Sequence, residues 1–271
     1  MAIHSKGFIY NGRSTSEFNV KIATIGSFDT HQDLGMTREV VRDRPIDSFM
    51  DIIYGSFYSS NLEFTITVIK EDESRFTNSE IRQLNKWLIG YNYPKKLELD
   101  SCVLGMENVY FNCLFTSVST TSIGGIIGLT YNVVCDAPYG YEDFNVTYEI
   151  SETNSDVATE IMFYNTSDEN EEYLYPIVKI TKTGNGDISI ISSSDVNNDI
   201  TLEGLVDGEV VTIDSLRQTI NSTEQTFTNT LGGYDNFNHN WLRLLPGNNI
   251  IGVYGDCILE ISGKYARKVG I

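Results

Sequence analysis

Residues Gly7 to Gly12 read Gly-Phe-Ile-Tyr-Asn-Gly, and residues Ser16 to Ile22 read Ser-Glu-Phe-Asn-Val-Lys-Ile. An Asn-Gly pair supplies the two positive φ angles that a two-residue hairpin turn requires. The aromatic and β-branched residues on either side favour strands, because such side chains suit a half-buried pleated surface. The sequence therefore predicts a strand, a turn at Asn11-Gly12 and a second strand within residues 7–25.

Composition extends this prediction to the whole chain. The 271 residues include 16 Tyr and 13 Phe, and 41% of the sequence is hydrophobic. Such a chain is an ordinary globular protein, long enough for two domains that each bury a core. Period-two alternation at residues 62–70, where Leu62, Phe64 and Ile66 alternate with polar residues, predicts a further strand.

One helix is expected, at residues 78–89. Thr77 and Glu80 have the spacing of a capping box, in which each side chain satisfies an orphan backbone amide of the other residue. Ile81, Leu84 and Leu88 place an apolar stripe along one side, with Trp87 beside it. Gly90 suits the left-handed position that commonly follows a last helical turn.

The remaining pattern divides the chain near residues 140–147. Residues 26–48 are polar and carry mixed charges, which predicts a long exposed loop or arm. Strands are expected near 96–104, 108–119 and 126–136, and they complete a first domain at 1–144. The second domain, 145–271, has strand-like segments separated by Asn, Gly and Asp, a pattern typical of a β-sandwich of jelly-roll type. Its expected strands are 146–151, 158–164, 175–182, 187–192, 199–203, 209–214, 216–220, 241–245, 249–254 and 256–262.

Charge argues against nucleic acid as a ligand. The chain has 19 basic and 37 acidic side chains, a net charge of −18. Residues 145–271 hold 7 basic and 19 acidic side chains, so this half alone carries −12. A protein that binds DNA by neutralising phosphates needs the opposite balance. The first residues contain no apolar run long enough for a signal peptide or membrane span, so we expect synthesis and folding in a cytosol.

Motifs of catalysis and metal binding are missing from the sequence. The three histidines, His4, His31 and His239, have no neighbours at metal-ligand spacing. No nucleophile elbow, phosphate-binding loop or zinc-protease helix is found. The four cysteines, Cys102, Cys113, Cys135 and Cys257, follow no C-x-x-C pattern and are expected as buried free thiols. The sequence predicts a protein without catalytic site, metal or cofactor, and not an enzyme.

Both ends of the chain resemble one family. The segment from Gly7 to Val20, with Phe8, Asn11, Gly12, Phe18 and Val20, is similar to the start of the distal tail (siphovirus tail component) proteins of phages that infect Gram-positive bacteria. The segment Asn240-Trp241-Leu242-Arg243-Leu244-Leu245-Pro246-Gly247-Asn248 resembles the closing strand and Pro-Gly-Asn turn of the same family. The resemblance spans the whole chain.

The resemblance implies a mainly β fold with two parts: a β-barrel-like belt domain that bears one helix and an arm, and a galectin-like C-terminal sandwich. It also implies a homo-hexameric ring at the phage tail tip, through which DNA passes without specific binding. The expected partners are the major tail tube protein, the tail-associated lysin or hub protein, and receptor-binding or baseplate proteins. No membrane is involved. Arg38, Arg42 and Arg44 are candidates for contacts between subunits.

A host cell-wall glycan-binding module is the alternative function. Tyr173, Tyr175 and Tyr234 near predicted loops favour it, as does the sandwich itself. The galectin sugar motif His-x-Asn-x-Arg is absent around all three histidines, so a galectin-like shape does not by itself imply lectin activity. Trp241 is expected in the core of the sandwich, because Leu242 and Leu244 alternate on the opposite face of the same apolar strand.

Overall fold

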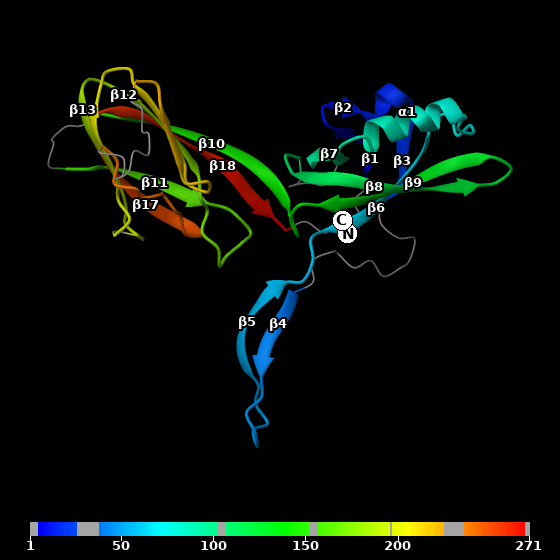
Figure 1. Ribbon diagram of the computed structural model, residues 1–271, viewed down its shortest axis with the longest axis horizontal. Coiled ribbons are helices and arrows are strands. Elements are labelled where there is room, and N and C mark those ends of the chain that lie inside the picture. Colours follow the sequence, from blue (N-terminus) through cyan, green and yellow to red (C-terminus); the bar gives the residue numbers. More distant parts are fainter. Residues whose placement is uncertain are drawn as a thin grey trace. The chain divides into compact units, whose positions relative to one another are not determined.

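The computed structural model describes residues 5–25, 38–101, 107–151, 157–195, 197–224 and 236–268. Its residues form two compact units (Figure 1). The first extends to Glu142 and also takes in Arg267 and Lys268, and the second is Asp143–Ala266. Both are built from antiparallel strands, and α1 is the one α-helix of the described ranges. The predicted mainly β fold class is confirmed.

The elements of the first unit lie in the following order along the chain. They are β1 (Ser5–Tyr10), β2 (Arg13–Ser14), the 3-10 helix η1 (Thr15–Phe18), β3 (Val20–Ile25), β4 (Arg38–Asp43), β5 (Ile52–Tyr58), β6 (Glu63–Lys70), α1 (Asn78–Leu88), β7 (Lys95–Ser101), β8 (Tyr110–Ser122) and β9 (Ile126–Cys135). Seven of the strands form one antiparallel sheet in the order β2-β1-β7-β8-β9-β6-β3. β4 and β5 form a separate two-stranded sheet.

The predicted Asn-Gly turn is present. Asn11 and Gly12 have φ of 50° and 76°, and Tyr10 pairs with Arg13 across them. The expected strand at 16–22 is only partly correct, because the chain first makes η1. A capping box explains the difference: the Ser14 side chain accepts from the Ser16 amide, and the Glu17 carboxylate accepts from the Ser14 amide. The strand then begins at Val20.

Helix α1 supplies the aromatic centre of the first core. Its capping box is formed, with the Thr77 amide donating to Glu80 at 2.7 Å. Leu84, Trp87 and Leu88 are its buried residues. The Trp87 indole N–H donates to the carbonyl of Tyr10 at 3.1 Å, which ties the helix to β1.

The second unit consists of two sheets. Strands β10 (Gly140–Ile150) and β18 (Cys257–Arg267) contain the points at which the chain passes between the units. The others are β11 (Thr159–Asn165), β12 (Ile177–Lys182), β13 (Gly186–Ser192), β14 (Ile200–Leu205), β15 (Val210–Asp214), β16 (Thr219–Ser222) and β17 (Gly247–Tyr254). One sheet has the order β16-β15-β12-β18-β10 and the other β11-β17-β13-β14.

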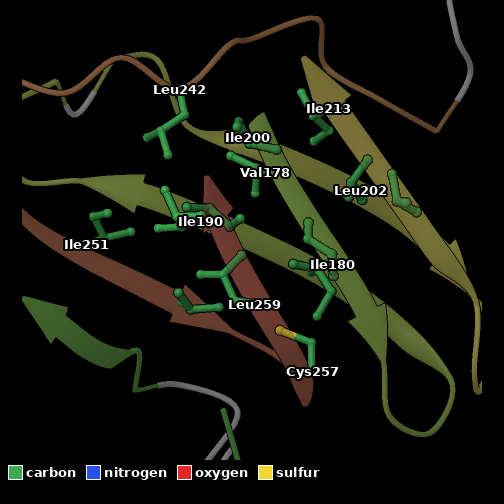
Figure 2. Close-up of a cluster of buried hydrophobic side chains, with 14 of the residues drawn as sticks. Val178, Ile180, Ile190, Ile200, Leu202, Ile213, Leu242, Ile251, Cys257 and Leu259 are labelled. Carbon is green, nitrogen blue, oxygen red and sulfur yellow. The ribbon is translucent and has the colours of Figure 1, made fainter. Parts of the chain in front are cut away.

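The two sheets enclose an aliphatic core. Val178 and Ile180 of β12 and Leu259 of β18 come from one sheet, and Ile190 of β13 and Ile251 of β17 come from the other. Figure 2 shows these side chains turned toward one another, with the thiol of Cys257 at one end of the cluster. Strands β12 and β13 alternate buried residues with partly or fully exposed ones, the pattern expected of a sandwich whose outer faces contact solvent.

Two predictions of local structure differ from the structure. Residues 38–43, expected in a long exposed loop or arm, are exposed but form strand β4, and its partner β5 at 52–58 was not expected. The expected strand at 241–245 is irregular, with only an isolated bridge between Leu244 and Leu174. The Trp241 carbonyl accepts from the Asn198 side chain at 2.8 Å.

Candidate assembly surface

Strands β4 and β5 with their connection, residues 38–58, form a hairpin that we call the arm hairpin; β4 and β5 appear in light blue in Figure 1. Valines and isoleucines in both strands favour extended backbone. The register shifts between Val41 and Arg42, and Gly55 nearby has φ of 138°, which suits a β-bulge. Within the described residues, β4 and β5 pair only with each other.

The tip of the arm hairpin is held by polar contacts. The Ser48 amide donates to the Pro45 carbonyl at 3.1 Å, and the Met50 amide donates to the Ser48 hydroxyl at 3.0 Å. Asp51 accepts from Arg44 at 2.6 Å and from Arg42 at 3.2 Å. The tip therefore has a defined conformation without burying an apolar side chain.

No side chain of the arm hairpin is buried, although much of it is apolar. Phe49 is completely exposed (101%), Ile46 is 94% exposed and Met50 is 78% exposed. Six further apolar side chains along the strands are exposed, namely Val40, Val41, Ile52, Ile53, Tyr54 and Phe57. An isolated two-stranded hairpin is marginally stable in water, and contiguous apolar patches of this kind mark contact surfaces. The arm hairpin is therefore a candidate contact surface.

Contacts at Tyr58 tie the base of the arm hairpin to the first unit. The Arg38 guanidinium lies 4.6 Å from the centroid of the Tyr58 ring and donates to its hydroxyl at 3.3 Å. Tyr139 packs edge-on against the same ring, with centroids 6.4 Å apart, and the Lys268 ammonium lies 5.9 Å from it.

The three arginines expected at subunit contacts all lie on or beside the strands of the arm hairpin. Arg38 contacts Tyr58 at the base, and Arg42 and Arg44 both bind Asp51 near the tip. The guanidinium groups of Arg42 and Arg44 are therefore partly compensated within their own chain. Sequence reasoning missed the larger signal, the exposed apolar residues between positions 46 and 57.

The motif residues of the first unit serve its core. Phe8 and Val20 are buried, and Phe18 packs against the same cluster. Trp87 stacks on Phe8 and on Phe18, with interplanar angles of 12° and 9°. Asn11 and Gly12 make the turn described above. These residues maintain the fold and are separate from the arm hairpin.

The motif residues of the second unit are less buried than expected, and a neighbouring residue holds their turn. Trp241 is only partly buried, against the core and edge-on to Phe237 at 5.2 Å. Gly247 has φ of 82° and follows Pro246 at the start of β17, while Asn248 is exposed. The neighbouring Asn249 is fully buried, and its amide group donates to the carbonyls of Leu245 and Gly247 and accepts from the Leu245 amide. Asn249 therefore holds the turn.

Three cysteines confirm the prediction of buried free thiols: Cys113, Cys135 and Cys257. Cys102 lies outside the described residues. Burial raises the pKa of the Cys257 thiol to about 11, and the Cys113 pKa is raised by a hydrogen bond to Cys135 and by burial. Thiols in this state are poor nucleophiles.

In the ranges that the structure describes, no group of three His, Cys, Asp or Glu side chains is arranged to hold a metal ion. The helix in those ranges is too short and too polar to cross a membrane.

Comparison with known families identifies the chain. A model described as "Phage tail protein N-terminal domain" matches residues 3–137, and one described as "Phage tail C-terminal domain" matches residues 139–263. Together they cover nearly the whole sequence. The chain belongs to this family of phage tail proteins. A comparison with curated protein sequences gave no significant match.

Two solved structures from other phages share the fold of this phage tail protein. The crystal structure of the Dit protein of phage SPP1, described as a paradigm of the hub adsorption apparatus in phages that infect Gram-positive bacteria, matches with a TM-score of 0.68 at 12% identity over 96% of this chain and 98% of that one. A chain of the phage p2 baseplate in its activated conformation matches with a TM-score of 0.52 at 9% identity, over 95% and 97% of the two chains.

Proposed function

We propose that this phage tail protein is a distal tail protein, six copies of which form a ring at the tail tip. The ring joins the tail tube to the tail-associated lysin or hub protein and to the receptor-binding apparatus, and its role is structural and not catalytic. The observation that carries the proposal is an exposed apolar arm hairpin in a chain whose fold matches that of SPP1 Dit over nearly its full length.

A second copy of this chain is the occupant that we propose for the arm hairpin. A ring closes when one surface of each subunit meets a different surface of the next, so one protruding apolar element per subunit is sufficient. Burial of a Phe, Ile or Met side chain contributes about 1.5–3 kcal/mol, so burial of the three tip residues alone would contribute several kcal/mol per interface. In the described part of the chain, the outer edges of β4 and β5 pair with no other strand, and they offer backbone hydrogen bonds to the same neighbour.

The proposed ring leaves a channel for DNA. A net charge of −18 per subunit prevents the ring from adhering to the phosphate backbone, because no excess of basic groups is available to release its counterions. Ejection requires that DNA passes such a channel without binding.

The experiment measures assembly and incorporation of charged variants at the tip. Phe49→Asp and Ile46→Asp place a carboxylate in the apolar surface, and both positions are exposed, so the fold of the subunit is not affected. Ile123→Asp is the matched control, since Ile123 is a similarly exposed apolar residue (72%) elsewhere in the first unit. Light scattering over a concentration series would report the mass in solution, and complementation of a phage that lacks the protein would report tail assembly.

We expect the wild type and Ile123→Asp to form the ring, either alone or within tails, and both tip variants to lose it. A strictly monomeric wild type at high concentration, together with no ring in micrographs of assembled particles, would contradict the hexamer. Tip variants that assemble as well as the wild type would contradict the role of the arm hairpin and leave the ring itself standing.

A further inference from the structure

In the second unit, a short antiparallel contact places consecutive side chains of two segments on opposite faces. Leu174 and Leu244 exchange two backbone hydrogen bonds of 2.9 Å each. The side chains of both residues pack into the core of the sandwich. Residues next to a bridged pair point to the opposite face, so Tyr173, Tyr175 and Arg243 share the outer one.

The two tyrosines present their rings to solvent. Each is 40% exposed, and the ring centroids are 6.4 Å apart with the planes at 60°. In the part of the chain that the structure describes, neither phenolic hydroxyl has a hydrogen-bond partner. The pair thus offers two aromatic faces and two free hydroxyl groups at one place.

Arg243 is held rigidly beside these rings. Its guanidinium binds both carboxylate oxygens of Asp195, with Nη2 to Oδ1 at 3.1 Å, and lies 4.8 Å from the centroid of the Tyr173 ring. The hydrogen bond from Arg243 holds the pKa of Asp195 below its ordinary value, so the carboxylate stays ionised at neutral pH. A guanidinium carries five N–H groups, and the bonds to Asp195 use two of them.

We propose that Tyr173, Tyr175, Arg243 and Asp195 form a binding site for a neutral saccharide. One face of a hexopyranose ring consists of C–H groups and stacks on an aromatic ring, whose negative π-face attracts those hydrogens. Each sugar hydroxyl can both donate and accept a hydrogen bond. Two hydroxyls on neighbouring carbons can therefore bind the Arg243–Asp195 ion pair, which offers N–H donors and carboxylate acceptors side by side. The site does not depend on the formation of a ring.

Local charge selects a neutral saccharide over an anionic polymer. Asp195 compensates Arg243, so this guanidinium does not act as a free cation toward phosphate or carboxylate groups. The exposed residues Glu171 and Glu172 directly precede Tyr173 and add two acidic side chains. Close like charges repel, and a polyanion gains nothing from displacing its counterions here.

A protein partner is the competing occupant, because exposed Tyr and Arg side chains are also common in protein interfaces. The exposed carboxylates of Glu171 and Glu172 beside the rings favour the saccharide, since acidic side chains are depleted in such interfaces. A protein contact is still a distinct outcome of the test.

The test uses the full chain and a panel of neutral hexose and N-acetylhexosamine oligosaccharides, with polyglycerol phosphate as the anionic comparison. Binding is measured by calorimetry or by saturation-transfer NMR. The double variant Tyr173→Ala/Tyr175→Ala removes both rings, and Tyr173→Phe/Tyr175→Phe keeps them. Tyr164→Ala is the matched control, because Tyr164 is an exposed tyrosine of the same unit, on β11.

We expect the wild type to bind at least one neutral oligosaccharide, the double alanine variant to bind at least tenfold more weakly, and the double phenylalanine variant and Tyr164→Ala to keep most of the affinity. Thermal unfolding of each variant separates loss of binding from loss of fold. The proposal is overturned by binding to polyglycerol phosphate alone, by no binding to the panel, or by equal losses in the double alanine variant and Tyr164→Ala. Saccharide binding that survives the double alanine variant while incorporation into tails fails would reassign this face to a protein partner.

Discussion

The indole of Trp87 stacks on the ring of Phe18, with centroids 4.4 Å apart and planes 9° from parallel. Trp87 lies in α1 and Phe18 ends the 3-10 helix before β3, so the contact joins two segments distant in sequence. The Arg13 guanidinium also lies 4.5 Å from the centroid of the Phe18 ring. The opening motif and the helix are thus parts of one aromatic cluster.

Replacement of Trp87 by Ala should destabilise the first unit by about 3–5 kcal/mol, because it leaves a cavity between Phe8 and Phe18 and removes the hydrogen bond to the Tyr10 carbonyl. Arg82→Ala, on the exposed side of the same helix, should change stability by no more than about 0.5 kcal/mol. Denaturant titration followed by circular dichroism measures both. Equal effects of the two substitutions would show that the cluster does not hold the helix.

Asn249→Ala and Asn248→Ala form a second matched pair. The Asn249 side chain is buried and makes three hydrogen bonds to the turn before β17, so its replacement by Ala removes all three bonds and should cost about 1–3 kcal/mol. Asn248 is exposed, and its replacement should have little effect on stability. The difference between the two unfolding midpoints is the measurement, and the reverse order would contradict the assignment.

Most of the regular structure was predictable because its sequence signals are local. The α1 capping box and stripe predicted residues 78–89, and the helix is 78–88. The turn at Asn11-Gly12 followed from the φ angles that these residues accept. Asn249 could have been found, since Ile251 and Val253 alternate inward on β17 and the same alternation reaches back to Asn249.

The arm hairpin could not be predicted in the same way. Period-two patterns report a strand with one buried face, and neither face of β4 or β5 is buried. Its apolar residues also come in adjacent pairs, Val40-Val41 and Ile52-Ile53, which alternation does not recognise. The bridge between Leu174 and Leu244 was equally hidden, because a single pair of residues leaves no periodic signal.

The buried cysteines should not react with a thiol reagent such as DTNB while the protein is folded. Only a thiolate attacks the reagent, and with a pKa of about 11 the Cys257 thiol stays almost fully protonated at pH 8. In a Cys102→Ser background, absorbance should rise only after concentrated guanidinium chloride is added. A rapid rise in the native state would show that these thiols are accessible.

Stability at acid pH should depend on Glu80. A hydrogen bond from the Thr77 backbone, followed by bonds from Lys70 and the Thr77 hydroxyl, lowers its pKa from 4.5 to about 2. A lowered folded-state pKa means that the contribution is present above pH 4.5 and is lost as the pH falls toward 2. Glu80→Gln should therefore unfold with a smaller pH dependence in this window. The exposed Glu71→Gln is the control, and an unchanged pH dependence in Glu80→Gln would contradict the prediction.

The last prediction concerns DNA and the carboxylate of Asp51. The wild-type protein should not shift duplex DNA in a gel at physiological ionic strength, since its net charge is −18 and two of the three arginines of the arm hairpin bind Asp51. Asp51→Asn removes that carboxylate and leaves the guanidinium groups of Arg42 and Arg44 free to neutralise phosphates. Each phosphate neutralised releases a counterion, so affinity gained in this way falls steeply as salt is added.

We therefore expect Asp51→Asn to bind DNA at low salt and to release it as the salt concentration rises. Binding at low salt should be stronger in the proposed ring, where the exposed arginines of six subunits act together. Asp207→Asn is the control for the loss of one carboxylate, because Asp207 binds the Gly184 amide and no basic side chain. It removes the same charge without freeing a cation, so it should leave DNA mobility unchanged. A salt-sensitive shift by the wild-type protein at physiological ionic strength would count decisively against a ring that DNA passes without binding.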